Sequence, residues 1–442
     1  MKLYRYWQQF KRGSHRILVR IGILKPRSRL SSDEDPPNES DKEYIIRLRN
    51  LIDEPEPKNP GWEFPKSALH FKKELTPYEQ NEIQDYELVY TAGSRNSKFG
   101  TCHSLQQFTT NEGRYRVRKN DHIDYRYVVE KKIGEGSYAE VFKCIDTRNE
   151  KCVAVKIMKR PISNLYKEAA TLLRIHKHGK GEESHAVELL DYEHFRKHLF
   201  IVMNLYDTDF THYLAMKPRQ ETIHYIMQLR SVLHGLEFLR RHDIVHGDLK
   251  PSNILLNLND KFNMKLADFG LSATSNQPVG TNVFQTVNFR APEVFLELQV
   301  TCAIDMWSFG AIVARVVNGN HFLNEYTAAK QFALLLDYFG MPPKEMMAKI
   351  RHPNKFFTYG GHPQYCTAIQ DENGEVTYET HPHDTAAIGR QPPGERSRLG
   401  EFFQGKENAR ILEFLNKCFT WKWENRIHPA FALMHPLFYA GD

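Results

Sequence analysis

Apolar and polar residues alternate in five short runs in the middle of the chain. Alternation with a period of two predicts strands that bury one face against a core. The expected strands are Tyr127 to Ile133, Glu140 to Asp146, Cys152 to Met158, Val187 to Tyr192 and Leu199 to Met203. A helical run, Leu165 to His176, interrupts them. These runs predict a small, mostly antiparallel β lobe, from about Tyr125 to Met203.

Beyond Leu205 the period changes to that of helices. Apolar residues recur every three or four positions in three long stretches, which are Ile223 to Arg241, Ile304 to Val317 and Ala328 to Phe339. Such spacing places the apolar side chains on one face of an α-helix. The chain is therefore predicted to be α+β and two-lobed, with a small antiparallel β N-lobe followed by a mainly α C-lobe.

The composition fits a folded core with polar extensions. The 442 residues are 41% hydrophobic, enough to fill the interior of a fold of about 300 residues. The net charge of +6 is a mild basic bias, and no clustered basic and aromatic motif points to a nucleic-acid partner. The six cysteines show no short paired spacing, which disfavours zinc and favours reduced thiols. No apolar run is long enough to predict an integral membrane segment.

The first 60 residues differ from the rest in composition. Residues 1–30 contain many Lys and Arg, no Asp or Glu, and apolar residues spaced along one helical face. Three interpretations remain open: a solvated basic tail, an amphipathic helix that binds a surface, and a mitochondrial transit peptide. Residues 31–60 are acidic and contain several prolines, the composition of a disordered linker. We predict a disordered extension over residues 1–60.

The segment from His246 to Asn253 carries polar residues suited to phosphoryl transfer. It reads His-Gly-Asp-Leu-Lys-Pro-Ser-Asn, and Asp-Phe-Gly follows from Asp268. Moving a γ-phosphoryl group requires metal ions, charge compensation and an oriented hydroxyl group more than covalent chemistry. Asp248 is the candidate base for the substrate hydroxyl, and Lys250 is the cation that neutralises the migrating group. Asn253 and Asp268 offer the hard oxygen ligands that Mg²⁺ prefers.

A glycine-containing run and a lysine lie upstream of that segment. The run begins with Ile133, Gly134, Glu135 and Gly136. Glycines in such a turn let backbone N–H groups approach phosphates. In a later predicted strand, the alternation places Ala154 and Lys156 on one face. Glu168, near the start of the predicted helix, is the candidate carboxylate that holds Lys156 on the nucleotide phosphates.

These motifs, in this order, resemble those of eukaryotic protein kinases. Arg290 to Glu293 resembles the end of the activation segment, and Asp305 to Gly310 resembles the buried helix that anchors the catalytic loop. Three further stretches resemble the dual-specificity tyrosine-regulated kinases (DYRK), specifically their second class. These stretches are Leu75 to Ile83, Asn120 to Tyr127, and Gly361 to Cys366 continued by Arg390 to Ser397.

The resemblance implies a serine/threonine kinase that uses ATP and Mg²⁺ on protein substrates, often with tyrosine autophosphorylation. It also implies a division of the chain. The parts are an accessory segment packing on the N-lobe (61–124) and a kinase domain (125–438), with N-lobe 125–203, C-lobe 204–438 and a family insert at about 351–400. ATP is expected between the lobes, with Met203 as gatekeeper. The other implied nucleotide contacts are Val141, Ala154, Leu255 and the hinge residues Asn204 and Leu205.

Departures from the family pattern lie around the catalytic loop and the activation segment. Gly247 stands where many kinases have an arginine that binds activation-loop phosphate, so that cation is missing at this position. The family's autophosphorylated tyrosine aligns with Val283, and a following arginine aligns with Val287. Ser252 replaces a glutamate that helps to read an arginine in the substrate. The preference for residues on either side of the target residue therefore stays open.

Two functional classes fit these residues: an active kinase, and a pseudokinase that binds ATP or partners without turnover. The groups that touch the chemistry are all present, which favours the enzyme. We expect a cytoplasmic or nuclear protein, with mitochondrial targeting by the basic N-terminus as the lesser alternative. The oligomeric state stays open.

Overall fold

The computed structural model describes residues 40–49, 52, 55–99, 105–159, 166–179, 183–216, 221–279, 284–320, 323–381, 383–388, 390–394, 397–403 and 409–438. The chain divides into two compact units. Unit 1 comprises Met1–Ala170 and Leu189–Leu205, and unit 2 comprises Thr171–Glu188 and Tyr206–Asp442. The interpretations of residues 1–30 and the alignment at Val283 lie outside the described residues.

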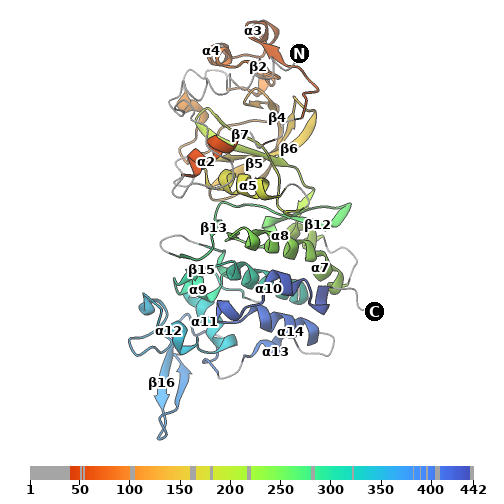
Figure 1. Ribbon diagram of the computed structural model, residues 1–442. Helices are drawn as coiled ribbons and strands as arrows, with labels where there is room; N and C mark the ends of the chain where they lie inside the picture. Colours follow the sequence, from red (N-terminus) through yellow and green to blue (C-terminus); the bar gives the residue numbers. More distant parts are fainter. Residues whose placement is uncertain are drawn as a thin grey trace. The chain divides into compact units, whose positions relative to one another are not determined.

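Unit 1 is built on a six-stranded antiparallel sheet with the order β3-β4-β5-β6-β8-β7 (Figure 1). Its strands are β3 (His122–Ile123), β4 (Tyr127–Glu135), β5 (Ala139–Asp146), β6 (Lys151–Met158), β7 (Leu189–Phe195) and β8 (His198–Asn204). The five predicted strands are confirmed, with boundaries that differ by one to three residues. Strand β7 begins at Leu189 because Val187 donates its N–H to the carbonyl group of Leu266 instead of joining the sheet. Helix α5 (Lys167–His178) confirms the predicted helical run.

The segment that precedes the sheet packs on it and shares its core. Its elements are β1 (Trp62–Glu63), α3 (Lys66–His70), α4 (Pro77–Glu82), η2 (Ile83–Asp85), β2 (Leu88–Val89), η3 (Arg95–Ser97) and η4 (Leu105–Phe108). Leu75, Ile83 and Val89 are buried in one cluster with sheet residues such as Val155. This segment is therefore part of the fold of unit 1 and not a separate module.

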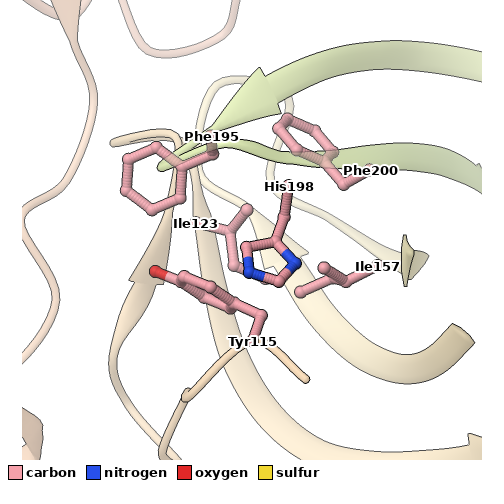
Figure 2. A pocket seen from close by; sticks show the side chains of 6 residues that line it. All are labelled: Tyr115, Ile123, Ile157, Phe195, His198 and Phe200. Carbon is pink, nitrogen blue, oxygen red and sulfur yellow. The ribbon is translucent and has the colours of Figure 1, made fainter. Parts of the chain in front are cut away.

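Figure 2 shows one place where this segment meets the sheet. The side chains of Tyr115, Ile123, Ile157, Phe195, His198 and Phe200 pack around one point there and leave no room for a water molecule. Both ring nitrogens of His198 have partners: Nε2 lies 2.9 Å from Thr109 Oγ1, and Nδ1 lies 2.9 Å from the carbonyl oxygen of Met158. The histidine thus links the accessory segment to strand β6.

The predicted disorder of residues 1–60 is wrong at Ser40–Arg49, which holds helix α2 (Asp41–Leu48). Ser40 and Glu43 form a capping box at its start, and such a box satisfies two N–H groups that a helix end leaves open. Tyr44 and Ile45 are buried. A short apolar pair within an acidic, proline-containing stretch is too weak a periodic signal to predict a packed helix.

Unit 2 is mainly helical. Its longer helices are α7 (Thr222–Gln228), α8 (Arg230–Arg241), α10 (Ala303–Asn318), α11 (Ala328–Phe339) and α14 (Ala409–Cys418). Its shorter ones are α6 (Phe210–Ala215), α9 (Pro292–Phe295), α12 (Lys344–Met347), α13 (Leu399–Phe402) and α15 (Pro429–Ala432). Helices α10 and α11 confirm two predicted helices. The predicted helical stretch from Ile223 to Arg241 is also confirmed, but it is divided into α7 and α8 at Leu229, whose N–H is shared between the carbonyl groups of Tyr225 and Ile226.

Short strands and 3₁₀ turns hold the loops of unit 2. Strands β9 (Thr208–Asp209), β11 (Ile254–Asn257) and β12 (Asp260–Leu266) form a three-stranded sheet, and the two-stranded pairs are β10 (Ile244–Val245) with β13 (Ala273–Thr274) and β14 (Gln277–Pro278) with β15 (Gln299–Val300). The 3₁₀ turns are η5 (Pro251–Asn253), η6 (Val287–Phe289), η7 (Pro353–Lys355), η9 (Trp423–Asn425) and η10 (Pro436–Phe438). A hairpin of β16 (Cys366–Gln370) and β17 (Val376–Thr380) extends away from the helices of unit 2 (Figure 1). Among the described residues, no helix has the length and apolar character needed to cross a membrane.

Candidate active site

The loop between β10 and β11 is fixed by the buried helix α10. The carboxylate of Asp305 accepts the N–H of His246 at 2.8 Å and that of Gly247 at 3.0 Å. Burial raises the pKa of Asp305 to about 7, and the two N–H donors oppose that rise. This confirms the predicted anchoring of the catalytic loop by the segment that starts at Asp305.

Gly247 occupies a position that other residues would adopt only under strain. Its φ is +77°, and a Cβ added there would collide with the carbonyl oxygen of Leu271. Glycine reaches such left-handed angles without the steric cost that a side chain imposes. An arginine at this position would therefore be strained, and its Cβ would clash with the backbone at Leu271.

Asp248 sits at the centre of a small polar network. Its carboxylate lies 2.6 Å from Lys250 Nζ and accepts the N–H and the hydroxyl of Thr286 at 2.9 and 2.8 Å. Lys250 also donates to the hydroxyl of Thr286 at 3.1 Å. The predicted base, Asp248, and the predicted phosphoryl-neutralising cation, Lys250, are thus together, and Thr286 holds the carboxylate in place.

The two predicted metal ligands flank the same loop. The side-chain amide of Asn253 donates to the carbonyl oxygen of Asp248 at 2.8 Å, so its oxygen is the atom that a cation would meet. Asp268 has a φ of +64°, a left-handed angle that is rare for a residue with a side chain. Backbone strain of this kind persists where the surroundings enforce it, which is common at functional sites.

Two neighbours enforce the turn at Asp268. Phe269 is fully buried, and its ring centroid lies 4.9 Å from that of His246. His246 Nε2 lies 3.1 Å from the carbonyl oxygen of Ala267. Burial lowers the pKa of His246, so the ring is neutral at pH 7 and its donor can serve this carbonyl group. The histidine therefore ties the catalytic loop to the Asp-Phe-Gly turn.

The segment after residue 283 is ordered by a buried glutamine that the sequence motifs did not single out. Gln285 is 1% exposed and has a φ of +57°. Its side-chain nitrogen donates to the carbonyl group of Ile304 at 2.9 Å and to Ser308 Oγ at 2.8 Å. The backbone carbonyl oxygen of Gln285 accepts hydrogen bonds from two nitrogens of the Arg290 guanidinium group. Motif spacing cannot reveal this role, because the partners lie up to 23 residues away.

Unit 1 contains the predicted lysine and its carboxylate. Lys156 Nζ, on β6, lies 2.6 Å from Glu168 Oε2, near the start of α5, and both side chains are nearly buried. The pair joins the sheet to the helix. The ion pair fixes the position of the Lys156 ammonium group. A fixed positive charge of this kind can bind phosphate groups.

The glycine-containing run of unit 1 forms the turn between β4 and β5. A Cβ at Gly136 would meet nothing nearer than a carbonyl oxygen at 3.9 Å, and one at Gly134 would make ordinary contact with Val141. The fold itself therefore does not require glycine at either position. A ligand that comes close to the backbone would still explain why glycine stands at both positions, because a side chain there would block it. Ile133, just before them, is partly exposed.

The other predicted nucleotide contacts are divided between the units. Val141 is paired with Lys156, and Ala154 with Met203, across the sheet of unit 1. Asn204 ends β8, and Leu205 is the last residue of that part of unit 1. Leu255 lies in unit 2, on β11, where it is half-buried. Each residue occupies a strand or strand end, and its role in binding stays a prediction.

The fold of each unit, with the loop at Asp248 and the pair at Lys156, defines a protein kinase. A model of the protein kinase domain matches residues 127–438. The relative named dual specificity tyrosine-phosphorylation-regulated kinase mbk-2, from Caenorhabditis briggsae, is 32% identical over 383 residues, which cover 84% of this chain and 46% of the relative. Dual specificity tyrosine-phosphorylation-regulated kinase 4, from Homo sapiens, is 30% identical over 380 residues, which cover 83% of this chain and 68% of the relative. The chain belongs to the family of dual specificity tyrosine-phosphorylation-regulated kinases.

The relatives differ in length from this chain. The human relative numbered 3 is 30% identical over 382 residues, 84% of this chain and 64% of the relative. The chain spans about half the length of the worm relatives that it matches, since 46% of each is covered.

Proposed function

We propose that this protein is an active protein kinase that transfers the γ-phosphoryl group of ATP to serine or threonine of protein substrates. The observation that carries the proposal is the arrangement around Asp248. Its carboxylate, Lys250 and the hydroxyl of Thr286 lie within hydrogen-bonding distance of one another. A carboxylate fixed in this way is placed to accept a proton from a hydroxyl group, and Lys250 compensates the charge that develops.

The donor set fits magnesium and nucleotide. Asp268 and Asn253 supply a carboxylate and an amide oxygen, which are hard ligands of the kind Mg²⁺ takes. When bound, Mg²⁺ neutralises phosphate oxygens of the nucleotide. The chain's own part is to hold these ligands: the left-handed angle of Asp268 and the buried Phe269 fix one, and the bond from Asn253 to the Asp248 carbonyl group fixes the other. Lys156, held by Glu168, is the proposed contact to the phosphates.

A pseudokinase is the second candidate. The departures at Val283 and Val287 favour it, as does Ala139, which stands in the phosphate loop in place of a glycine. Those positions are not among the groups that accept protons or bind metal. Phosphoryl transfer depends mainly on positioning and electrostatics, and each group with such a role is present. The active enzyme is therefore the better supported function.

Transfer of radiolabel from γ-labelled ATP to a generic basic protein tests the proposal. Asp248→Asn is expected to cut turnover by roughly 1,000-fold or more, since the proton acceptor and its charge are lost, while ATP binding is retained. Ser252→Ala, a change at an exposed position of the same loop, is the matched control. Equal rates for wild type and Asp248→Asn would contradict the assignment.

A further inference from the structure

Helix α2 binds the edge strand of unit 1 through a defined set of contacts. Arg49, which follows the helix, donates to Glu193 Oε2 at 2.6 Å, and its guanidinium lies 5.2 Å from the ring centroid of Tyr192. The hydroxyl of Tyr192 donates to the carbonyl group of Ile45. Tyr44 and Ile45 are buried. The helix is thus held on β7 by an ion pair, a cation–π contact and a hydrogen bond.

The same strand holds the start of helix α5. His194, which follows Glu193, places its Nε2 3.1 Å from the hydroxyl of Tyr166. The carbonyl group of Tyr166 accepts the N–H of Ala170 and so closes the first turn of α5. Tyr166 is therefore fixed twice, by its ring to β7 and by its backbone to the helix.

The two sets of contacts meet at Glu193. Its Oε2 binds Arg49, and its Oε1 accepts the N–H of His194 at 2.8 Å. The pKa of Tyr166 is raised, first by burial and then by the negative charge of Glu193. Asp191 adds a second carboxylate, 3.7 Å from Arg49. Removing Arg49 would leave these carboxylates with less positive charge beside the residue that anchors α5.

We propose that Arg49, His194 and Tyr166 are positioning residues for the Lys156–Glu168 pair, so that helix α2 is a docked element that sets α5 for phosphoryl transfer. Glu168 lies two residues after Tyr166 and 2.6 Å from Lys156. A shift of the first turn of α5 would carry Glu168 away from the lysine. This inference rests on the proposed function, since it assigns the docked helix a role in nucleotide turnover.

Kinetics of the full chain test the proposal. Arg49→Met removes the charge and keeps the length of the side chain, and Tyr166→Phe removes only the hydroxyl group. Each is expected to raise the KM for ATP about fivefold or more, with the KM for a peptide substrate unchanged. Arg49→Lys should restore part of the loss. Matched controls are Lys58→Met, from an exposed pair with Glu150, and Tyr359→Phe, at a fully exposed tyrosine.

A double-mutant cycle separates positioning from two unrelated defects. If Arg49 acts through Tyr166, the double variant should be no worse than the more damaged single variant, because coupled residues are not additive. Losses that multiply fully, or single variants that match the controls, would overturn the proposal.

Hydrogen exchange provides a readout that does not depend on activity. The amides of Ala169 and Ala170 should exchange faster in Arg49→Met and Tyr166→Phe than in the controls, while those of β5 should not change. If wild type transferred phosphate as slowly as Asp268→Asn, the proposed function would be wrong, but this result by itself would not contradict the docking of α5. In that case unchanged exchange in α5 would defeat this inference as well, and faster exchange would support the docking of α5 by α2.

Discussion

At the scale of single residues, Thr286 is the contact that most constrains the chemistry. Its hydroxyl bonds to both Asp248 and Lys250, at 2.8 and 3.1 Å. Thr286→Val keeps the volume and removes the hydroxyl, so the carboxylate loses one of its supports. We expect turnover to fall by roughly 10- to 100-fold, because small misplacements of reacting groups are costly. Thr286→Ser should keep most of the activity, and a Thr286→Val variant as fast as wild type would show that the contact is dispensable.

The position of Thr286 also bears on regulation. A phosphate on this hydroxyl would place negative charge against the carboxylate of Asp248, and like charges at such distances repel. Phosphorylation of Thr286 is therefore expected to lower activity and not to raise it.

At the scale of elements, Arg196 joins the accessory segment to the sheet. It stands in the turn between β7 and β8 and donates to Glu79 and Glu82 at 2.9 and 2.7 Å. Its guanidinium also lies 3.8 Å from the ring centroid of Phe108. Arg196→Met should destabilise unit 1 by about 3–5 kcal/mol, because it leaves a buried carboxylate with less compensation. Thermal unfolding measures the loss, and Arg241→Met, at an exposed helix end, is the control.

The carboxylate of Glu79 makes this linkage sensitive to acid. Burial alone would raise the pKa of Glu79, but His122, Lys98 and Arg196 outweigh burial and lower that pKa from 4.5 to about 2. A carboxyl group with a lowered folded-state pKa stabilises the protein above its unfolded pKa, and this contribution is lost as the pH falls through the folded value. We expect stability to decline between about pH 4.5 and 2, and Glu79→Gln should flatten that decline. Stability can be followed by circular dichroism during an acid titration. If the assignment were wrong, the decline of stability with pH would be as steep in Glu79→Gln as in wild type.

The elements predicted from the sequence are those whose signal is local. Alternation of apolar residues revealed the strands of the sheet, and the motif around Asp248 was recognisable because its members are close in sequence. The contacts of Arg196 and Gln285 could not be predicted, since Arg196 meets partners more than 100 residues away. Helix α2 could not be predicted because its buried face is short and lies within an acidic, proline-containing stretch whose composition is typical of disorder.

At the scale of the whole molecule, we predict a kinase that needs no phosphotyrosine in its activation segment. No tyrosine lies between Asp268 and Glu293. Two valines stand where the family has a charged pair; Val287 is half-buried, and Val283 lies outside the described residues. The buried hydrogen bonds of Gln285 order the described part instead. Protein made in bacteria should therefore be active as folded.

Mass spectrometry before and after phosphatase treatment, with activity at both stages, tests that prediction. Peptide masses should show no phosphate on this segment before treatment, and the rate of phosphoryl transfer should be unchanged by the phosphatase. Gln285→Leu, which keeps the volume and removes the hydrogen bonds, should lower activity in both samples. Activity that vanishes on dephosphorylation would contradict the prediction.

The assignment of this chain as an active kinase is tested most directly by comparing wild type with Asp268→Asn in transfer of the γ-phosphoryl group of ATP, using phosphatase-treated protein and excess Mg²⁺. We predict transfer to serine or threonine by wild type and loss of that transfer in the variant. Melting temperatures without nucleotide should be nearly equal, because the role proposed for Asp268 is to bind metal and not to support the core. An inactive wild type, or a variant that transfers phosphate at the wild-type rate, would contradict the assignment.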